Sequence, residues 1–306
     1  MHFKVNAFAK INLFLNILGQ RPDGFHDVRF VMQEVDLADT LDIKVIGSGL
    51  QIDFMCSLPE IAGEDNLVVK AYHAFYRQVT GTPYALKVFL QKNIPVQAGL
   101  GGGSSDAAAM LLALNQLHQN NLSQAELLML AAELGSDVPF FILGQTCLAT
   151  GRGEVVSPLP SMPPYEVLIV KPITINIPTP FAYDLVRKAN HYNHYKEQDF
   201  SLWQAFLETD EKPNALPASL LHNDFESPVF VVYPQLMQAK QQLSRFGDVL
   251  LSGSGPSLFV LLNAPYVDYQ TQIEAIFPPS TWNLLPCRFQ ASSKASNEIS
   301  SLKPCV

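Results

Sequence analysis

The most informative stretch of the sequence is Pro95-Val-Gln-Ala-Gly-Leu-Gly-Gly-Gly-Ser-Ser-Asp106. Four glycines fall within five positions, and the small and apolar residues that follow, as far as Leu117, recur at helical spacing. The pattern predicts a glycine-rich loop that opens directly into a buried helix. Glycine lets a ligand approach the backbone closely, and the N-terminus of a helix favours an anion. We therefore expect the phosphate chain of a nucleotide at this loop.

Two better-known phosphate loops do not fit this stretch. No lysine precedes Ser104, as a Walker A loop requires, and the glycine spacing differs from that of the dinucleotide-binding fingerprint. From the local pattern alone, a flexible loop with Ser104 or Ser105 as the helix cap stays an open alternative.

Six further motifs accompany the loop, and together they resemble the GHMP family of small-molecule kinases. The motifs are Ala9-Lys-Ile-Asn-Leu13, Arg21-Pro-Asp-Gly-Phe-His26, Gly135-Ser-Asp-Val-Pro139, Ile177-Pro-Thr179, Asn223-Asp-Phe-Glu226 and Ser252-Gly-Ser-Gly-Pro-Ser257. They follow in order over most of the chain, which makes the set far more specific than any one motif. The resemblance implies a two-domain GHMP kinase fold with the active site in the cleft between the domains.

The patterns of the remaining chain favour an α+β class, because helices and strands alternate irregularly. Residues 3–15 alternate as a strand, with Lys10 and Asn12 on the face opposite the core. Four prolines fall between Ser157 and Pro164. We therefore expect an N-terminal ATP-binding domain (1–160), a C-terminal substrate-binding domain (161–290) and a tail (291–306). Other expected elements are strands at 28–37, 41–46, 84–91, 167–170, 249–251, 258–262 and 284–289, and helices at 67–79, 123–134, 234–246 and 266–277. We expect Asn66 to cap the helix at 67–79, Ser123 and Glu126 to form a capping box for the next helix, and Thr179 to cap and start a further helix.

Composition narrows the possible partners. The chain has 306 residues and a formal net charge of −8, and this acidic balance argues against nucleic-acid binding. No run of 18 apolar residues occurs, so we expect no membrane span. The four cysteines show no zinc or redox spacing, and the N-terminus has no secretory signal. We expect a cytoplasmic protein that acts on a small-molecule substrate.

The resemblance implies that Asp137 and Lys10 are the catalytic residues. In the family, the proton acceptor lies in the Gly-x-Asp-Val-Pro pattern, which here spans residues 135–139. A lysine ammonium nearby would stabilise negative charge on the acceptor oxygen. The sequence leaves open whether Asp137 removes the proton or mainly orients the hydroxyl, and from local pattern alone an N-cap aspartate is the alternative.

ATP and Mg²⁺ are the cofactors that the resemblance implies. The residues expected to bind ATP are Pro95, Val96, Gln97, Ala98, Gly99, Leu100, Gly101, Gly102, Gly103, Ser104 and Ser105. Ser105 offers a hydroxyl to the metal, and Asp106 offers a carboxylate. An acid beside a triphosphate repels it unless a metal bridges the two, so the metal ligands stay unassigned.

Within the family, the resemblance is to members that phosphorylate the 2-hydroxyl of a cytidine diphosphate sugar alcohol in the non-mevalonate isoprenoid pathway. It implies a substrate site made of Asn12, Phe25, His26, Thr179, Tyr183, Gly253 and Gly255. Phe25, where the family usually has tyrosine, and Tyr183 would sandwich the cytosine, and His26 would recognise its edge. Phe181 is the alternative to Tyr183.

Several alternatives stay open at this point. From the residues alone, a core position for Phe25 and a surface position for His26 are favoured over a binding role, and Gly253 to Gly255 fit a plain hairpin turn. The protein also fits another GHMP kinase, of the homoserine or mevalonate type, or a non-catalytic sensor that binds nucleotide. The presence of both Lys10 and Asp137 speaks against the sensor, and the Phe25-His26 pair speaks against the other kinases.

Overall fold

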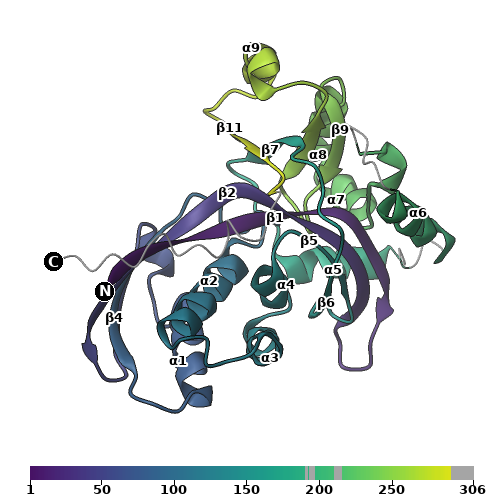
Figure 1. The fold of residues 1–306 in the computed structure, drawn as a ribbon. Coiled ribbons are helices and arrows are strands. Elements are labelled where there is room, and N and C mark those ends of the chain that lie inside the picture. Colours follow the sequence, from purple (N-terminus) through teal and green to yellow (C-terminus); the bar gives the residue numbers. More distant parts are fainter. Residues whose placement is uncertain (190–191, 193–196, 210–215, 291–306) are drawn as a thin grey trace.

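The computed structural model describes residues 1–189, 192, 197–209 and 216–290. Two long antiparallel strands, β1 (His2–Gln20) and β2 (His26–Ser48), form the centre of the larger sheet (Figure 1). The prediction of two separate strands within β2 is wrong. The pairing with β1 and β4 continues through a few register shifts, so the strand bends without ending.

Within the described residues, the larger sheet has seven strands, with a main path of β3-β4-β2-β1-β8 and with β5 and β6 branching from β2. The other strands of this sheet are β3 (Ile52–Cys56), β4 (Tyr84–Gln91), β5 (Thr146–Thr150), β6 (Val155–Pro158) and β8 (His222–Asn223). Strand β8 joins the larger sheet from late in the sequence, because it pairs in parallel with β1.

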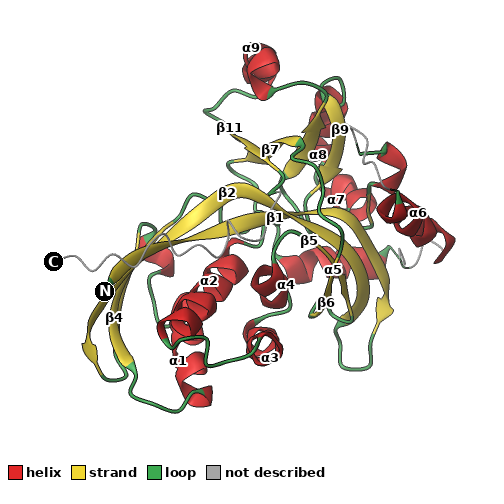
Figure 2. Cartoon of the chain, viewed as in Figure 1, coloured by secondary structure: helices red, strands yellow, loops and turns green. Residues whose placement is uncertain are grey.

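Helices α1 to α4 lie together against one face of the larger sheet (Figure 2). They are α1 (Leu67–Gln78), α2 (Gly102–Leu117), α3 (Gln124–Leu134) and α4 (Val138–Leu143). Helix α2, the helix predicted after the glycine loop, packs against the other three and against β1. The predicted cap at Asn66 and the capping box of Ser123 and Glu126 are confirmed. Helix α4 has six residues and was not expected from the sequence.

A smaller antiparallel sheet has the strand order β11-β7-β10-β9. Its strands are β7 (Glu166–Pro172), β9 (Gly247–Leu251), β10 (Leu258–Leu262) and β11 (Trp282–Arg288). Helix α8 (Pro234–Leu243) packs on β9 and β10, and α9 (Tyr266–Ile276) packs on β7. The other helices are α5 (Thr179–Lys188), α6 (Glu197–Glu208), α7 (Glu226–Val232), and the 3₁₀ helices η1 (Pro59–Ile61) and η2 (Ala218–Leu220).

The chain passes from the larger to the smaller sheet between β6 and β7, through the proline-rich segment. The domain boundary at residue 160 stays a prediction, and the expected tail lies outside the described residues. The predicted cap at Thr179 is wrong, because Pro178 occupies the N-cap and Thr179 is the first helical residue. None of the described helices combines the length and the hydropathy needed to cross a membrane.

Two register shifts in the β1–β2 pairing exchange the two sides of the sheet toward which the side chains in the middle of β1 point. One shift lies between Phe8 and Ala9, and the other lies between Asn12 and Phe14. Residues 3, 5, 7, 15 and 17 pack in the core beneath α1 to α4, whereas residues 9, 11 and 13 pack with the smaller sheet. Side chains alternate along a strand, so the middle of β1 directs Lys10 toward the side of the glycine loop. Lys10 and Asn12 are therefore buried rather than exposed on an outer face.

Candidate active site

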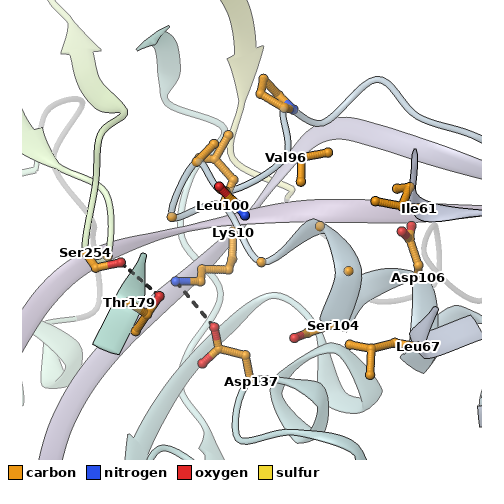
Figure 3. Close-up of a pocket in the computed structure, with 18 of the residues that line it drawn as sticks. Lys10, Ile61, Leu67, Val96, Leu100, Ser104, Asp106, Asp137, Thr179 and Ser254 are labelled. Carbon is orange, nitrogen blue, oxygen red and sulfur yellow. Dashed lines mark hydrogen bonds and ion pairs between the residues drawn. The ribbon is translucent and has the colours of Figure 1, made fainter. Parts of the chain in front are cut away.

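A cavity of about 670 Å³ lies between the glycine loop, β1 and the turn after β9. Residues 60–67 and Val96 line one end, and residues 97–104 line the middle. The other end contains Lys10, Asn12, Asp137, Thr179, Tyr183, Phe225, Gly253 and Ser254. Figure 3 shows Ile61, Leu67 and Val96 gathered at one side and Lys10 and Asp137 directed toward each other at the other. Lys10 and Asp137 mark the charged end of the cavity, the opposite end combines apolar side chains with Glu60, Glu64 and Asp65, and the glycine loop lies between the two ends.

The glycine loop adopts the backbone that its sequence predicts. Gly99 and Gly101 have φ values of 74° and 72°, in the left-handed region that favours glycine. A Cβ on Gly101 would lie 2.7 Å from the Phe141 ring, so a larger residue also lacks space there. Helix α2 begins at Gly102, and its first helical hydrogen bond runs from the N–H of Ser105 to the Gly101 carbonyl. The N–H groups of residues 102–104 precede that bond, and such groups at the start of a helix favour an anion.

Lys10 and Asp137 meet at the charged end of the cavity. The ammonium of Lys10 donates a 2.6 Å hydrogen bond to Oδ1 of Asn12 and lies 3.7 Å from Oδ2 of Asp137. Burial lowers the pKa of Lys10, and the Asp137 carboxylate opposes that effect only in part. Asp137 occupies the N-cap position of α4, but its side chain makes no capping hydrogen bond. The carboxylate therefore faces the cavity, and Asp137 is not a plain helix-capping aspartate.

Aromatic side chains gather beyond Lys10 and Asp137. The rings of His26 and Tyr183 stack at 4.5 Å, and Phe225 meets the Tyr183 ring edge-on at 4.9 Å. Tyr183 lines the cavity and Phe181 does not. His26 Nε2 is buried without a hydrogen-bond partner among the described residues. A buried polar atom without a partner is uncommon in folded proteins, which makes this nitrogen a candidate for a ligand contact.

Phe25 is not a core residue, because 51% of it is exposed. The guanidinium of Arg152 lies over its ring, 4.8 Å from the ring centre. Neither Phe25 nor His26 lines the main cavity, so both lie at its margin rather than within it. Arg152 was not predicted to lie at the site, although it stands within a conspicuous Gly-Arg-Gly turn.

The second glycine turn contributes Gly253 and Ser254 to the cavity, whereas Gly255 lies behind them. The N–H of Gly255 donates a 2.9 Å hydrogen bond to the Ser252 carbonyl, which closes the turn. The hydroxyls of Ser254 and Thr179 lie 3.1 Å apart, so the turn also contacts the start of α5. Gly255 therefore shapes this turn without contacting the cavity.

Asp106, one of the two candidate metal ligands, is instead paired with a lysine. Lys92 donates a 2.7 Å hydrogen bond to Oδ2 of Asp106 and also pairs with Asp39. Burial opposes the charge on Lys92, but the two carboxylates outweigh it and raise the pKa of Lys92. Ser105 is buried and Ser104 lines the cavity. The described part of the chain contains no cluster of three or more His, Cys, Asp or Glu side chains able to hold a metal ion.

Comparisons with known proteins agree with this geometry. Residues 66–145 match the family model for the GHMP kinases N terminal domain, and residues 204–276 match that for the GHMP kinases C terminal region. A 4-diphosphocytidyl-2-C-methyl-D-erythritol kinase of Gloeobacter violaceus is 38% identical over 263 residues, covering 84% of this chain and 85% of the relative.

Solved structures show the same relationship. The crystal structure of a 4-(cytidine 5'-diphospho)-2C-methyl-D-erythritol kinase matches with a TM-score of 0.72 at 32% identity, covering 94% of this chain and 99% of that one. A homoserine kinase of Cytophaga hutchinsonii matches with a TM-score of 0.68, but at 19% identity over 95% of each chain. The similarity to the homoserine kinase shows a shared fold and nothing more.

Proposed function

Because this chain belongs to the 4-diphosphocytidyl-2-C-methyl-D-erythritol kinases of the GHMP kinase family, we propose that it phosphorylates the 2-hydroxyl of 4-diphosphocytidyl-2-C-methyl-D-erythritol. ATP supplies the phosphoryl group, and the products are ADP and the 2-phosphate. The observation that best supports this proposal is the approach of Lys10 and Asp137 at one end of the cavity that the glycine loop lines.

ATP fits the cavity from the end that contains Ile61, Leu67 and Val96 to its middle. Ile61, Leu67 and Val96 offer the apolar walls that a purine base needs. The triphosphate then follows the glycine loop, where the first N–H groups of α2 and the helix dipole favour negative charge. This orientation directs the γ-phosphate toward Lys10 and Asp137.

The transfer itself requires one bond to form and one to break. The 2-hydroxyl oxygen of the acceptor bonds to the γ-phosphorus while the bond from that phosphorus to the β-γ bridging oxygen breaks, and ADP leaves. Asp137 accepts the hydroxyl proton on its carboxylate, which no capping bond occupies. The Lys10 ammonium, held by Asn12, stabilises the negative charge around the transferring group.

Mg²⁺ would neutralise phosphate charge in this reaction. The cavity fits a metal held mainly by phosphate oxygens and water, because Ser104 offers a hydroxyl beside the loop and Asp106 is engaged with Lys92. We propose no carboxylate ligand for the metal.

The acceptor's cytosine fits the aromatic group at the far end. Phe25 offers a half-exposed ring, and Tyr183 lines the cavity with His26 stacked on it, so the predicted sandwich of the base between Phe25 and Tyr183 would require His26 to move aside. The unpaired Nε2 of His26 would then bind the base edge. Arg152, which lies over the Phe25 ring and also pairs with Glu154, would offer positive charge to the diphosphate of the acceptor. Thr179 and Gly253 lie beside Lys10 and Asp137 in the cavity and would contact the sugar alcohol.

A coupled assay of ADP release tests the proposed function. The acceptors are 4-diphosphocytidyl-2-C-methyl-D-erythritol, homoserine and mevalonate, with a reaction lacking any acceptor as the baseline. We expect release above the baseline only with the cytidine diphosphate acceptor. Equal release with and without that acceptor would show that the proposal is wrong, and a response to homoserine or mevalonate alone would identify a different kinase.

A further inference from the structure

Asn223, the first residue of the Asn223-Asp-Phe-Glu226 motif, does not line the main cavity, yet its side chain is fully hydrogen-bonded. Asn223 lies on β8, beside β1, and is 4% exposed. Its Nδ2 donates hydrogen bonds of 2.7 Å to the Leu251 carbonyl and 2.8 Å to the Gly253 carbonyl. Its Oδ1 accepts a 2.9 Å bond from the Phe225 N–H. The amide thus fixes the start of the second glycine turn.

The second glycine turn in turn packs against the phosphate loop. The buried Ser252 hydroxyl donates a 3.1 Å hydrogen bond to the Gly99 carbonyl. A Cβ on Gly99 would overlap the Ser252 carbonyl, and one on Gly253 would lie 3.1 Å from the Gly99 carbonyl oxygen. The two backbones therefore touch, and a displacement of the turn displaces Gly99.

We propose that Asn223 is a positioning residue for the nucleotide, because it holds the Ser252–Gly253 turn that fixes the phosphate loop at Gly99. The proposal rests on the proposed function, since it requires the glycine loop to bind the phosphates of ATP. Asn223 contacts no substrate and acts through the turn alone.

The chemistry of Asn223 explains why an amide is required at this position. Two carbonyls and one N–H face the side chain, and only an amide offers two donors and one acceptor in a planar group of this size. An aspartate of the same shape would keep the bond from the Phe225 N–H. It would, however, direct a carboxylate oxygen at the carbonyls of Leu251 and Gly253 and repel the turn.

The test compares Asn223→Asp with Asn115→Asp. Asn115 is a buried amide that exchanges hydrogen bonds of 3.0 Å and 2.8 Å with the backbone of Leu122, and it does not line the cavity. Both substitutions make the same chemical change in the same kind of backbone clamp. We expect both to lower the melting temperature, whereas only Asn223→Asp should weaken ATP binding in calorimetric titration, by about tenfold.

Kinetics provide a second measurement. In Asn223→Asp, the KM for ATP should rise about tenfold, whereas in Asn115→Asp it should stay within about twofold of wild type. Equal ATP affinity in the Asn223→Asp and Asn115→Asp proteins would overturn the proposal.

If Asn223→Asp does not fold, Ser252→Ala decides the question, because it removes only the hydroxyl that bonds to Gly99. We expect about threefold weaker ATP binding in this variant, and an unchanged affinity would refute the proposal. Failure of the wild-type protein to bind ATP would instead refute the proposed function, and the role of Asn223 would fall with it.

Discussion

Lys10 lies closer to Asn12 than to Asp137. Its ammonium is 2.6 Å from the Asn12 amide oxygen and 3.7 Å from the nearer Asp137 oxygen. A tight ion pair would neutralise the carboxylate and restrict it, whereas this arrangement leaves Asp137 free to accept a proton. Burial of Lys10 in the same place increases the effect of its charge on a transferring phosphoryl group.

Replacement of Asp137 by asparagine should preserve the shape of the site and remove the proton acceptor. We expect turnover to fall by ~10² to 10⁴ and nucleotide affinity to change little, because Asp137 faces the acceptor. Turnover by ADP release and nucleotide binding by calorimetry measure the two effects separately. Asp53→Asn, on the half-exposed Asp53 of β3, is the control. Near-normal turnover in Asp137→Asn would remove Asp137 from the mechanism.

The elements that the sequence predicted well depend on local interactions. The strand Tyr84–Gln91 and the caps at Asn66 and Ser123 follow from alternation and from side chains that bond to a backbone two or three residues away. The glycine loop and α2 were predictable for the same reason. The family motifs supplied the α+β GHMP kinase fold, and the matching family models and structure confirm it.

The parts that the sequence did not predict depend on contacts between distant residues. The direction of Lys10 depends on register shifts between β1 and β2, which the alternation within β1 does not contain. The pairing of Lys92 with Asp106 and Asp39 joins residues 14 and 53 positions apart. Helix α4 is too short and too apolar to show a helical pattern of its own.

Replacement of Gly101 by alanine should weaken ATP binding by about tenfold or more, because a Cβ there is strained and crowded. The φ of Gly101 is 72°, and the added carbon would lie 2.7 Å from Phe141 and 3.1 Å from the Lys10 side chain. Gly49→Ala is the matched control, since Gly49 also has a positive φ but has open space around it. If the two variants bound ATP with equal affinity, the result would show that the phosphates bind elsewhere.

Replacement of Phe25 by alanine should weaken acceptor binding about tenfold or more, by analogy with the loss of base stacking in single-strand binders. The melting temperature and ATP affinity should change little, because half of the ring is exposed. Phe89→Ala provides the control, since Phe89 is a partly exposed phenylalanine of β4 that does not line the cavity. A large fall in melting temperature with unaltered acceptor affinity would mean that the cytidine site lies elsewhere.

Glu34 introduces a pH dependence into the stability of the fold. Its carboxylate is 2% exposed and accepts a 3.1 Å hydrogen bond from the Gln145 N–H, beside the C-terminal end of α4. Burial raises the pKa of Glu34 from 4.5 to about 7, and the bond from Gln145 offsets this only in part. The protonated form therefore stabilises the folded state below pH 4.5, and this contribution is lost as the pH rises through 7.

Glu34→Gln should therefore make the protein more stable than wild type at pH 8 and about equally stable at pH 4.5. The glutamine stays neutral at both pH values and keeps an oxygen for the Gln145 N–H. The gain at pH 8 should approach roughly 3 kcal/mol, because the pKa shift applies fully once the folded state is ionised. Urea unfolding between pH 4.5 and 8 measures the difference, with Glu133→Gln on the exposed face of α3 as the control. A difference that does not vary with pH would show that Glu34 is ionised in the folded protein throughout this range.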